Sequence, residues 1–211
     1  LDKYRYWGRH LTVSVDGVEH FCSGKIHCPC CLERKHKNAK TGYHHAMLSA
    51  VLVHPEQKEV FVIDNEPIIG QDGSSKNDCE RNAAKRLLNS MQFAYGKEWL
   101  VFVMDALYSC GPVIRQIVQN PKWQYVIGVK PDGNKSLFRQ FEGRDQRGQV
   151  KWIEWEWDGS THRFGYTNGL ALNSSNSDVR VNMLYYQELG RTGKKQTFTW
   201  ITGIHLTKAN V

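Results

Sequence analysis

The sequence contains no long hydrophobic run, and this absence removes one broad class of protein. No apolar segment in the 211 residues approaches the length that a membrane-spanning helix needs. The opening residues, Leu1-Asp-Lys-Tyr-Arg-Tyr6, lack the apolar centre of a secretory signal peptide. Internal repeats and low-complexity tracts are also missing. We expect a chain with no membrane partner. Because the first residue is not Met, we also expect a fragment or a processed protein.

The sequence also has little that favours secretion or nucleotide binding. Six cysteines in 211 residues are fewer than a secreted disulfide scaffold usually carries, and four of them fall in one window. The segment Gly70 to Lys76 (Gly-x-x-Gly-Ser-Ser-Lys) lacks the spacing of a Walker phosphate loop, so we predict a plain loop there. A reduced, cytoplasmic protein with a local thiol cluster fits this usage best.

The charge balance is basic. Lysine and arginine number 28 against 21 acidic residues, which gives a formal net charge of +7. Such a balance is compatible with a polyanionic partner, and equally with a soluble protein that is simply basic. With 40% hydrophobic residues, the chain is long enough for one sizeable core or a core with an appendage.

Hydrophobic patterning predicts an α/β domain in residues 10–131. Alternation predicts strands, and spacing of three and four residues predicts helices. Asn77 and Glu80 are expected to form the capping box of the first helix. The predicted order β-β-β-α-β-α-β has strands at 10–21, 44–53, 59–64, 100–105 and 123–129, and helices at 77–95 and about Pro112 to Val118. Residues 1–9 are an expected lead-in from an upstream region.

The character of the chain changes after Asp132. Five strand-like runs separated by turn-rich pieces predict a β-rich insertion over residues 132–205. The predicted strands are Ser136–Phe141, Val150–Trp157, Thr161–Tyr166, Val179–Leu189 and Gln196–His205. Residues 206–211 are expected to begin a final, truncated helix with Thr207 as its N-cap.

Two apolar strands each end on an aspartate. Leu11-Thr-Val-Ser-Val-Asp16 and Leu100-Val-Phe-Val-Met-Asp105 have this form. The predicted element order is that of the RNase-H-like fold, in which the first and fourth strands lie side by side and parallel. Asp16 and Asp105 would then meet at the carboxyl ends, where two carboxylates can hold two Mg²⁺ (or Mn²⁺) ions. Asp64 also ends a strand, but an edge strand running the other way favours a turn-forming role.

The same residues carry a resemblance to a family. Val13-Ser-Val-Asp16-Gly, Val101-Phe-Val-Met-Asp105-Ala and Tyr125-Val-Ile-Gly-Val-Lys130-Pro resemble the catalytic domain of bacterial insertion-sequence transposases of the DDE class, which are related to retroviral integrases. The resemblance extends over essentially the whole chain. It implies metal-dependent cleavage of double-stranded DNA at transposon ends, then strand transfer, by a homo-oligomer in the bacterial cytoplasm that associates with the nucleoid.

The third acidic motif of that family is missing. In the branch with a β-rich insertion, a Glu follows the insertion in the pattern Tyr-x-x-Arg-x-x-x-Glu-x-x-x-x-x-x-Lys, which this chain lacks. The resemblance therefore implies that the third acid lies after Val211, and that the fragment alone is inactive. Two other functions remain open: a zinc-stabilised DNA-binding protein without catalysis, and a general RNase-H-like nuclease.

The loop between the first two strands, residues 20–45, is rich in cysteine and histidine. Cys28-Pro-Cys-Cys31 offers two thiolates in one turn, and His36 and His45 could complete a tetrahedral Zn²⁺ site. Possible substitutes as ligands are Cys22, Cys30, His27 and His44. Unliganded thiols in a reduced loop are the alternative.

Candidate contacts to the DNA backbone come from basic side chains in three segments of the chain. They are Lys35, Lys37 and Lys40 in the Cys/His loop, Arg81 and Lys85 on the first helix, and Lys130 after the fifth strand. For the helix, an ordinary solvated face is the alternative interpretation.

Overall fold

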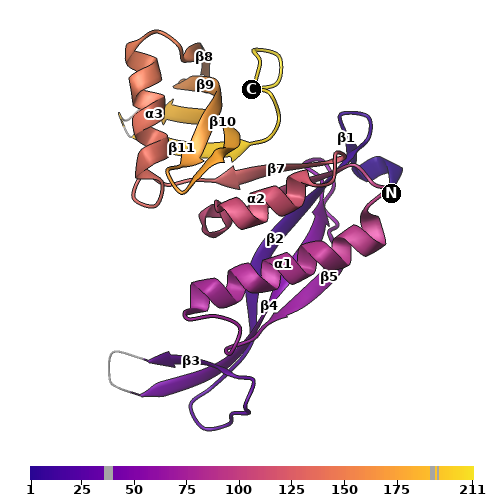
Figure 1. Cartoon of the computed structure of the whole chain (residues 1–211). Coiled ribbons are helices and arrows are strands. Elements are labelled where there is room, and N and C mark those ends of the chain that lie inside the picture. The colour runs from indigo at the N-terminus through magenta and orange to yellow at the C-terminus, as the bar shows by residue number, and fades with distance from the viewer. Residues whose placement is uncertain (36–39, 191–192, 194) are drawn as a thin grey trace. The chain divides into compact units, whose positions relative to one another are not determined.

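The structure is a computed structural model that describes residues 1–35, 40–190, 193 and 195–211. The chain forms two compact units. The first comprises Leu1–Leu107 with Gln119–Trp123, and the second comprises Tyr108–Val118 with Gln124–Val211. Both mix helices with mostly antiparallel strands (Figure 1). Among the described residues, no helix has the length and apolar character needed to cross a membrane. The predicted boundary between residues 131 and 132 stays a prediction.

The first unit is built on a mixed sheet whose central strand is β2. Strand β2 (His10–Ser23) pairs antiparallel with β4 (Thr41–Val53) on one side and parallel with β6 (Leu100–Met104) on the other. The remaining strands extend this frame at its edges. They are β1 (Arg5–Tyr6), which pairs with β2, and β3 (Leu32–Lys35) and β5 (Phe61–Ile68), which both pair with β4.

Helix α1 (Lys76–Tyr95) covers one face of this sheet and contacts β4 and β5 (Figure 1). The alternation that predicted the strands decides which side chains it covers, because every second residue is buried along β4 and along residues 10–15 of β2. The helix contributes residues at helical spacing to the same core. The buried side chains of this layer include Leu11, Val13, Val15, Leu48, Ala50 and Leu52 from the strands and Ala83, Ala84, Leu87, Leu88 and Met91 from the helix.

The second unit is an antiparallel sheet with two helices. Its strand order is β7-β11-β10-β9-β8. The bounds are α2 (Gly111–Val118), β7 (Trp123–Gly128), α3 (Lys135–Gln146), β8 (Lys151–Trp157), β9 (Ser160–Asn173), β10 (Asn176–Leu189) and β11 (Lys195–Thr202). Two short 3-10 helices, η1 (Asp2–Tyr4) and η2 (Ala106–Tyr108), lie elsewhere in the chain.

One predicted strand is a helix. The run Ser136–Phe141 lies inside α3, so the strand prediction was wrong. In a strand Arg139 would share the face of the buried Leu137 and Phe141, but Arg139 is exposed, as expected when four residues make about one helical turn. The Gln140 side chain then holds the helix on β9, donating to Ala171 O at 2.9 Å and accepting from Ala171 N at 3.1 Å. In a strand, the Gln140 side chain would lie on the opposite face from Leu137 and Phe141.

Other corrections concern element ends. Helix α1 begins one residue earlier than expected. Its N-cap is Ser75, whose side chain accepts from the Asp78 N–H, so the predicted Asn77–Glu80 capping box was wrong. Strand β5 continues through Asp64 to Ile68, which places Asp64 within the strand. A turn occupies residues 208–210, and the helix expected to follow stays a prediction.

Candidate functional site

Asp16 and Asp105 lie at matching positions on neighbouring strands. In the parallel pairing of β2 with β6, Val15 is the register partner of Met104, and each aspartate is the next residue along the chain. Both side chains are exposed. Asp105 directly follows β6, but the predicted end of the first strand at Asp16 was wrong, because β2 continues past it to Ser23. Each carboxylate is held by a backbone N–H: Asp16 Oδ1 accepts from Gly17 at 2.8 Å, and Asp105 Oδ1 accepts from Leu107 at 2.8 Å. The first unit alone therefore brings two carboxylate ligands to neighbouring positions on β2 and just after β6.

A third carboxylate, that of Glu80, approaches this part of β2 from α1. A methyl group placed on Gly17 would lie 2.9 Å from Glu80 Oε1, so the Glu80 carboxylate lies directly against the residue that follows Asp16. Burial raises the pKa of Glu80, Lys76 opposes that shift, and the carboxylates of Asp105 and Asp16 add to it. Glu80 is thus a half-buried acid whose pKa is raised further by the negative charges of both aspartates.

The sequence contained a signal for Glu80 that the capping interpretation obscured. Glu80 stands three and four residues before Ala83 and Ala84, on the stripe of α1 that becomes core. A charged residue on that stripe departs from the amphipathic pattern. Such a departure favours a functional carboxylate over a solvated one.

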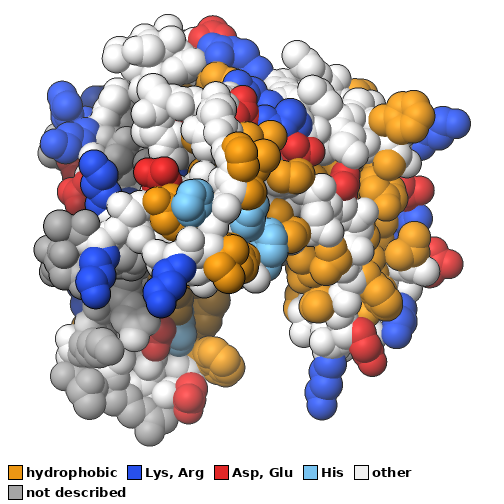
Figure 2. Space-filling view, turned by 90° about the horizontal axis from the view of Figure 1, so that it is seen from below, with side chains coloured by type: hydrophobic (Ala, Val, Ile, Leu, Met, Phe, Trp, Pro, Cys, Tyr) orange, Lys and Arg blue, Asp and Glu red, His pale blue; other side chains and the backbone are white. Residues whose placement is uncertain are grey.

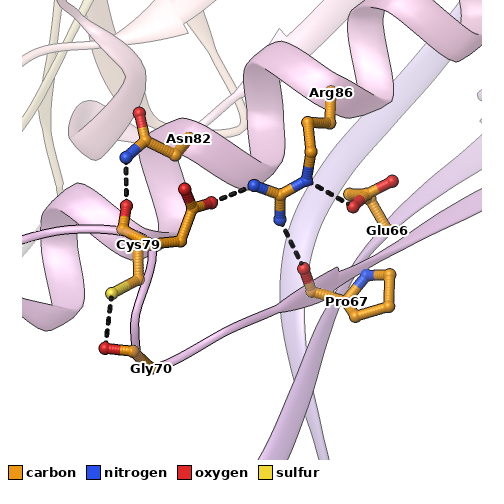
Figure 3. Close-up of polar contacts among 7 residues, drawn as sticks. Glu66, Pro67, Gly70, Cys79, Asn82 and Arg86 are labelled. Atoms are coloured by element: carbon orange, nitrogen blue, oxygen red, sulfur yellow. Dashed lines mark hydrogen bonds and ion pairs between the residues drawn. The ribbon is translucent and has the colours of Figure 1, made fainter. Parts of the chain in front are cut away.

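A hydrogen-bonded network around Arg86 fixes the loop that leads into α1. Arg86 Nε donates to Glu66 Oε1 at 2.6 Å, Nη2 donates to Pro67 O at 2.8 Å, and Nη1 contacts Asp72 (Figure 3). On the same helix, Asn82 donates to Asp72 O and Cys79 Sγ donates to Gly70 O at 3.8 Å. Strand β5, the 69–75 loop and the first turns of α1 are therefore tied together, and Glu80 stands in those first turns.

The three carboxylates are spread more widely than the ligands of a single ion. Among the described residues, the carboxylate oxygens of Asp16, Asp105 and Glu80 do not all lie within 4.8 Å of one another. Hard divalent cations prefer carboxylate oxygen, so the donor chemistry fits Mg²⁺ or Mn²⁺. A pair of ions about 3.5–4 Å apart spans a wider set of ligands than one ion does.

The predicted DNA-contacting residues differ in their surroundings. Arg81 is engaged inside the unit, because its Nε donates to Leu107 O at 3.2 Å and its Nη1 lies 4.0 Å from Asp78 Oδ1. Lys35, Lys40 and Lys130 are exposed, and Lys85 is half-buried. Lys37 lies outside the described residues.

A second cluster joins the Cys/His loop to β4. The ligand atoms of Cys28, Cys31 and His45 all lie within 4.8 Å of one another. The predicted ligand His36 lies outside the described residues. His44, a suggested substitute, belongs to the buried side of β4 and its Nε2 lies 3.7 Å from Glu19 Oε1. Burial lowers the pKa of His44, against the opposing effect of Glu19.

The other suggested ligands are placed differently. His27 stacks on Tyr43 with ring centroids 4.4 Å apart, while Cys22 and Cys30 are exposed. Figure 2 shows histidine side chains gathered beside hydrophobic ones on one face of the molecule. A cavity of about 680 Å³ lies next to the cluster, lined by Cys28, Cys31 and residues of the loop before α1.

Comparison with known proteins leaves the family open. No protein-family model matches the chain, and no curated protein matches it. Among solved structures, the chain is similar to a piggyBac transposase in the cryo-EM structure of its synaptic complex with hairpin DNA, with a TM-score of 0.47 and 11% sequence identity. The match covers 94% of this chain but 35% of that one, so the chain spans about a third of the transposase's length. A likeness at this level does not place the chain in a family.

Proposed function

We propose that the first unit is the RNase-H-like core of a metal-dependent DNA-cleaving and strand-transfer enzyme of the transposase type. The observation that carries the proposal is the pair Asp16 and Asp105, which follow register partners on adjacent parallel strands. Two exposed carboxylates at neighbouring positions of paired strands repel each other, and a divalent cation between them removes that repulsion. A divalent cation is the partner that a nucleic-acid phosphate also requires.

Asp16, Asp105 and Glu80 would hold Mg²⁺ or Mn²⁺. Bound there, the metal supplies activation of the attacking oxygen and charge neutralisation at the leaving oxygen. Asp16 would supply its ligand from the more central strand β2. The backbone N–H groups of Gly17 and Leu107 hold the two aspartate side chains in place. These side chains therefore lose little conformational freedom when the substrate binds.

Glu80 would complete the set from within this chain. Burial raises the pKa of Glu80 in the absence of metal, and a bound cation would lower it, because a cation stabilises the ionised form. The Glu that the family resemblance implies beyond Val211 stays a prediction. The role of Glu80 can be tested in this 211-residue chain.

The decisive experiment combines metal binding with DNA cleavage by the full-length protein. Titration calorimetry with Mn²⁺ should detect binding that Asp16→Asn and Asp105→Asn each weaken by about tenfold or more. Cleavage of DNA that carries the transposon ends should depend on Mg²⁺ or Mn²⁺. Its rate should fall by about a hundredfold or more in both variants.

Asp64→Asn is the matched control for both measurements. Asp64 Oδ1 accepts from the next N–H at 2.8 Å, as Asp16 Oδ1 does, but Asp64 lies on edge strand β5. The control should bind Mn²⁺ and cut as the unmodified protein does. Full activity of Asp16→Asn or Asp105→Asn would refute the site.

A binding protein without catalysis gives a different pattern. It would bind DNA with a strong salt dependence and no need for Mg²⁺, and the aspartate variants would bind normally. The exposed lysines Lys35, Lys40 and Lys130 are the proposed phosphate contacts. Replacing each contact with Ala should reduce the slope of log affinity against log salt by roughly one.

A further inference from the structure

The Cys28–Cys31–His45 cluster has the dimensions of a zinc site. The two sulfurs are 3.8 Å apart, and His45 Nε2 lies 3.4 Å from Cys28 Sγ and 3.3 Å from Cys31 Sγ. With zinc bonds of about 2.3 Å to sulfur and 2.0–2.1 Å to nitrogen, tetrahedral geometry separates two sulfurs by about 3.8 Å and sulfur from nitrogen by about 3.5–3.6 Å. The three atoms already stand within a few tenths of an ångström of these separations.

The local fold explains how the thiols converge. The Cys31 N–H donates to Cys28 O at 3.1 Å, which closes a turn over Cys28-Pro-Cys-Cys31. The Cys28 N–H in turn donates to Cys31 Sγ at 3.2 Å. This turn presents Cys28 and Cys31 on the same side, while Cys30 between them remains exposed.

The imidazole comes from a rigid element. His45 lies on β4 opposite Phe21 of β2, and alternation along β4 sends His44 to the buried side and His45 to the other. The cluster therefore joins a loop to a strand that is paired on both edges. A ligand on such a strand is held in position before the metal binds.

Two alternatives predict other distances or other behaviour. A disulfide needs its sulfurs about 2.05 Å apart, which 3.8 Å excludes for this arrangement. Free thiols hydrogen-bonded to imidazole would produce similar contacts, but such thiols would remain open to alkylating reagents when zinc is added.

We propose that Cys28, Cys31 and His45 bind one Zn²⁺ ion, which fastens the loop before β3 onto β4. Zinc takes a fourth ligand in structural sites, and a water molecule takes that place in open ones. This site is independent of the carboxylates of Asp16 and Asp105.

Metal content of the purified full chain tests the proposal directly. Apoprotein supplied with equimolar Zn²⁺ beside a weak chelator should retain one zinc per chain. Cys28→Ser and His45→Ala should each retain less than a tenth of that amount, because either change removes a ligand. Cys30→Ser, in the same turn but outside the cluster, is the matched control and should retain the full amount.

Two further readouts separate loss of a ligand from loss of the fold. Co²⁺ should give a thiolate charge-transfer band in the unmodified protein and the control, and not in Cys28→Ser, while circular dichroism of all three stays the same. Zinc should slow alkylation of Cys28 at least tenfold and leave Cys30 unchanged. Asp16→Asn should keep its zinc, so failure of the proposed catalytic function would not affect this result. Absence of retained zinc, or full retention in Cys28→Ser, would overturn the proposal.

Discussion

Replacing Arg86 with alanine should open the loop that leads into α1. The change removes hydrogen bonds to two carboxylates, Glu66 and Asp72, and to the carbonyl of Pro67. Burial alone would lower the pKa of Arg86, but Glu66 and Asp72 reverse the effect and raise it, so the guanidinium is charged and both acids depend on it. Without the Arg86 guanidinium, the half-buried carboxylates of Glu66 and Asp72 lose their ion-pair partner.

The expected cost follows from how far these groups are exposed. The Arg86, Glu66 and Asp72 side chains are 34%, 21% and 31% exposed. Fully exposed ion pairs contribute about 0–1 kcal/mol, and protected hydrogen bonds to charged groups about 1.5–3 kcal/mol each. For groups between these limits we expect a total loss of about 2–3 kcal/mol. Arg86→Lys keeps the charge but not the planar fork, so about half the loss should remain.

Cys79 provides a local assay for this loss. Its buried thiol donates to Gly70 O in the same loop, so alkylation requires the loop to open. A loss of 2–3 kcal/mol corresponds to roughly 30- to 150-fold faster alkylation, since each 1.4 kcal/mol is a factor of ten. Mass spectrometry measures the rate at Cys79 against that at Cys110, which belongs to the second unit and should not change.

A matched ion pair controls for charge removal in general. Arg115 and Asp178 form a bidentate pair in the second unit, with side chains 41% and 66% exposed. Arg115→Ala should therefore cost less than about 1 kcal/mol in urea unfolding and leave Cys79 protected. If Arg86→Ala changes Cys79 alkylation by less than about threefold, the network does not hold the loop.

Further predictions concern the carboxylate site and its pH dependence. Because the pKa of Glu80 is raised above its ordinary value of 4.5, its ionisation destabilises the metal-free fold, a cost absent below that value and present once the pH exceeds the raised pKa. Glu80→Gln should therefore raise the melting temperature in EDTA at pH 7 to 8 and not at pH 4, and should bind Mn²⁺ more weakly; a pH-independent difference would contradict this. Gly17→Ala places a methyl group 2.9 Å from Glu80 Oε1, so the carboxylate must move by about half an ångström. Calorimetry should show about tenfold weaker Mn²⁺ binding, whereas Gly24→Ala, with nothing within 4 Å of its added methyl group, should bind normally.

Local sequence patterns were sufficient for most of the elements that position the candidate site. Alternation along residues 10–15 and 44–53 predicted β2 and β4, and helical spacing from Ala83 to Met91 predicted α1. These patterns suffice because burial of one face imposes the period of the element on its sequence. They failed for α3, where the run Ser136–Phe141 is too short for periodicity to separate strand from helix.

The sequence by itself determined which candidate metal ligands the chain carries, and the tertiary structure decided which of them meet. Carboxylates at two strand ends and a Cys-x-x-Cys turn were visible without coordinates. That Glu80 joins the aspartates depends on how α1 packs against β2 at Gly17, and that the thiols of Cys28 and Cys31 meet His45 depends on how the loop before β3 folds against β4. Register and packing are set by contacts between segments far apart in the chain, which no local pattern records.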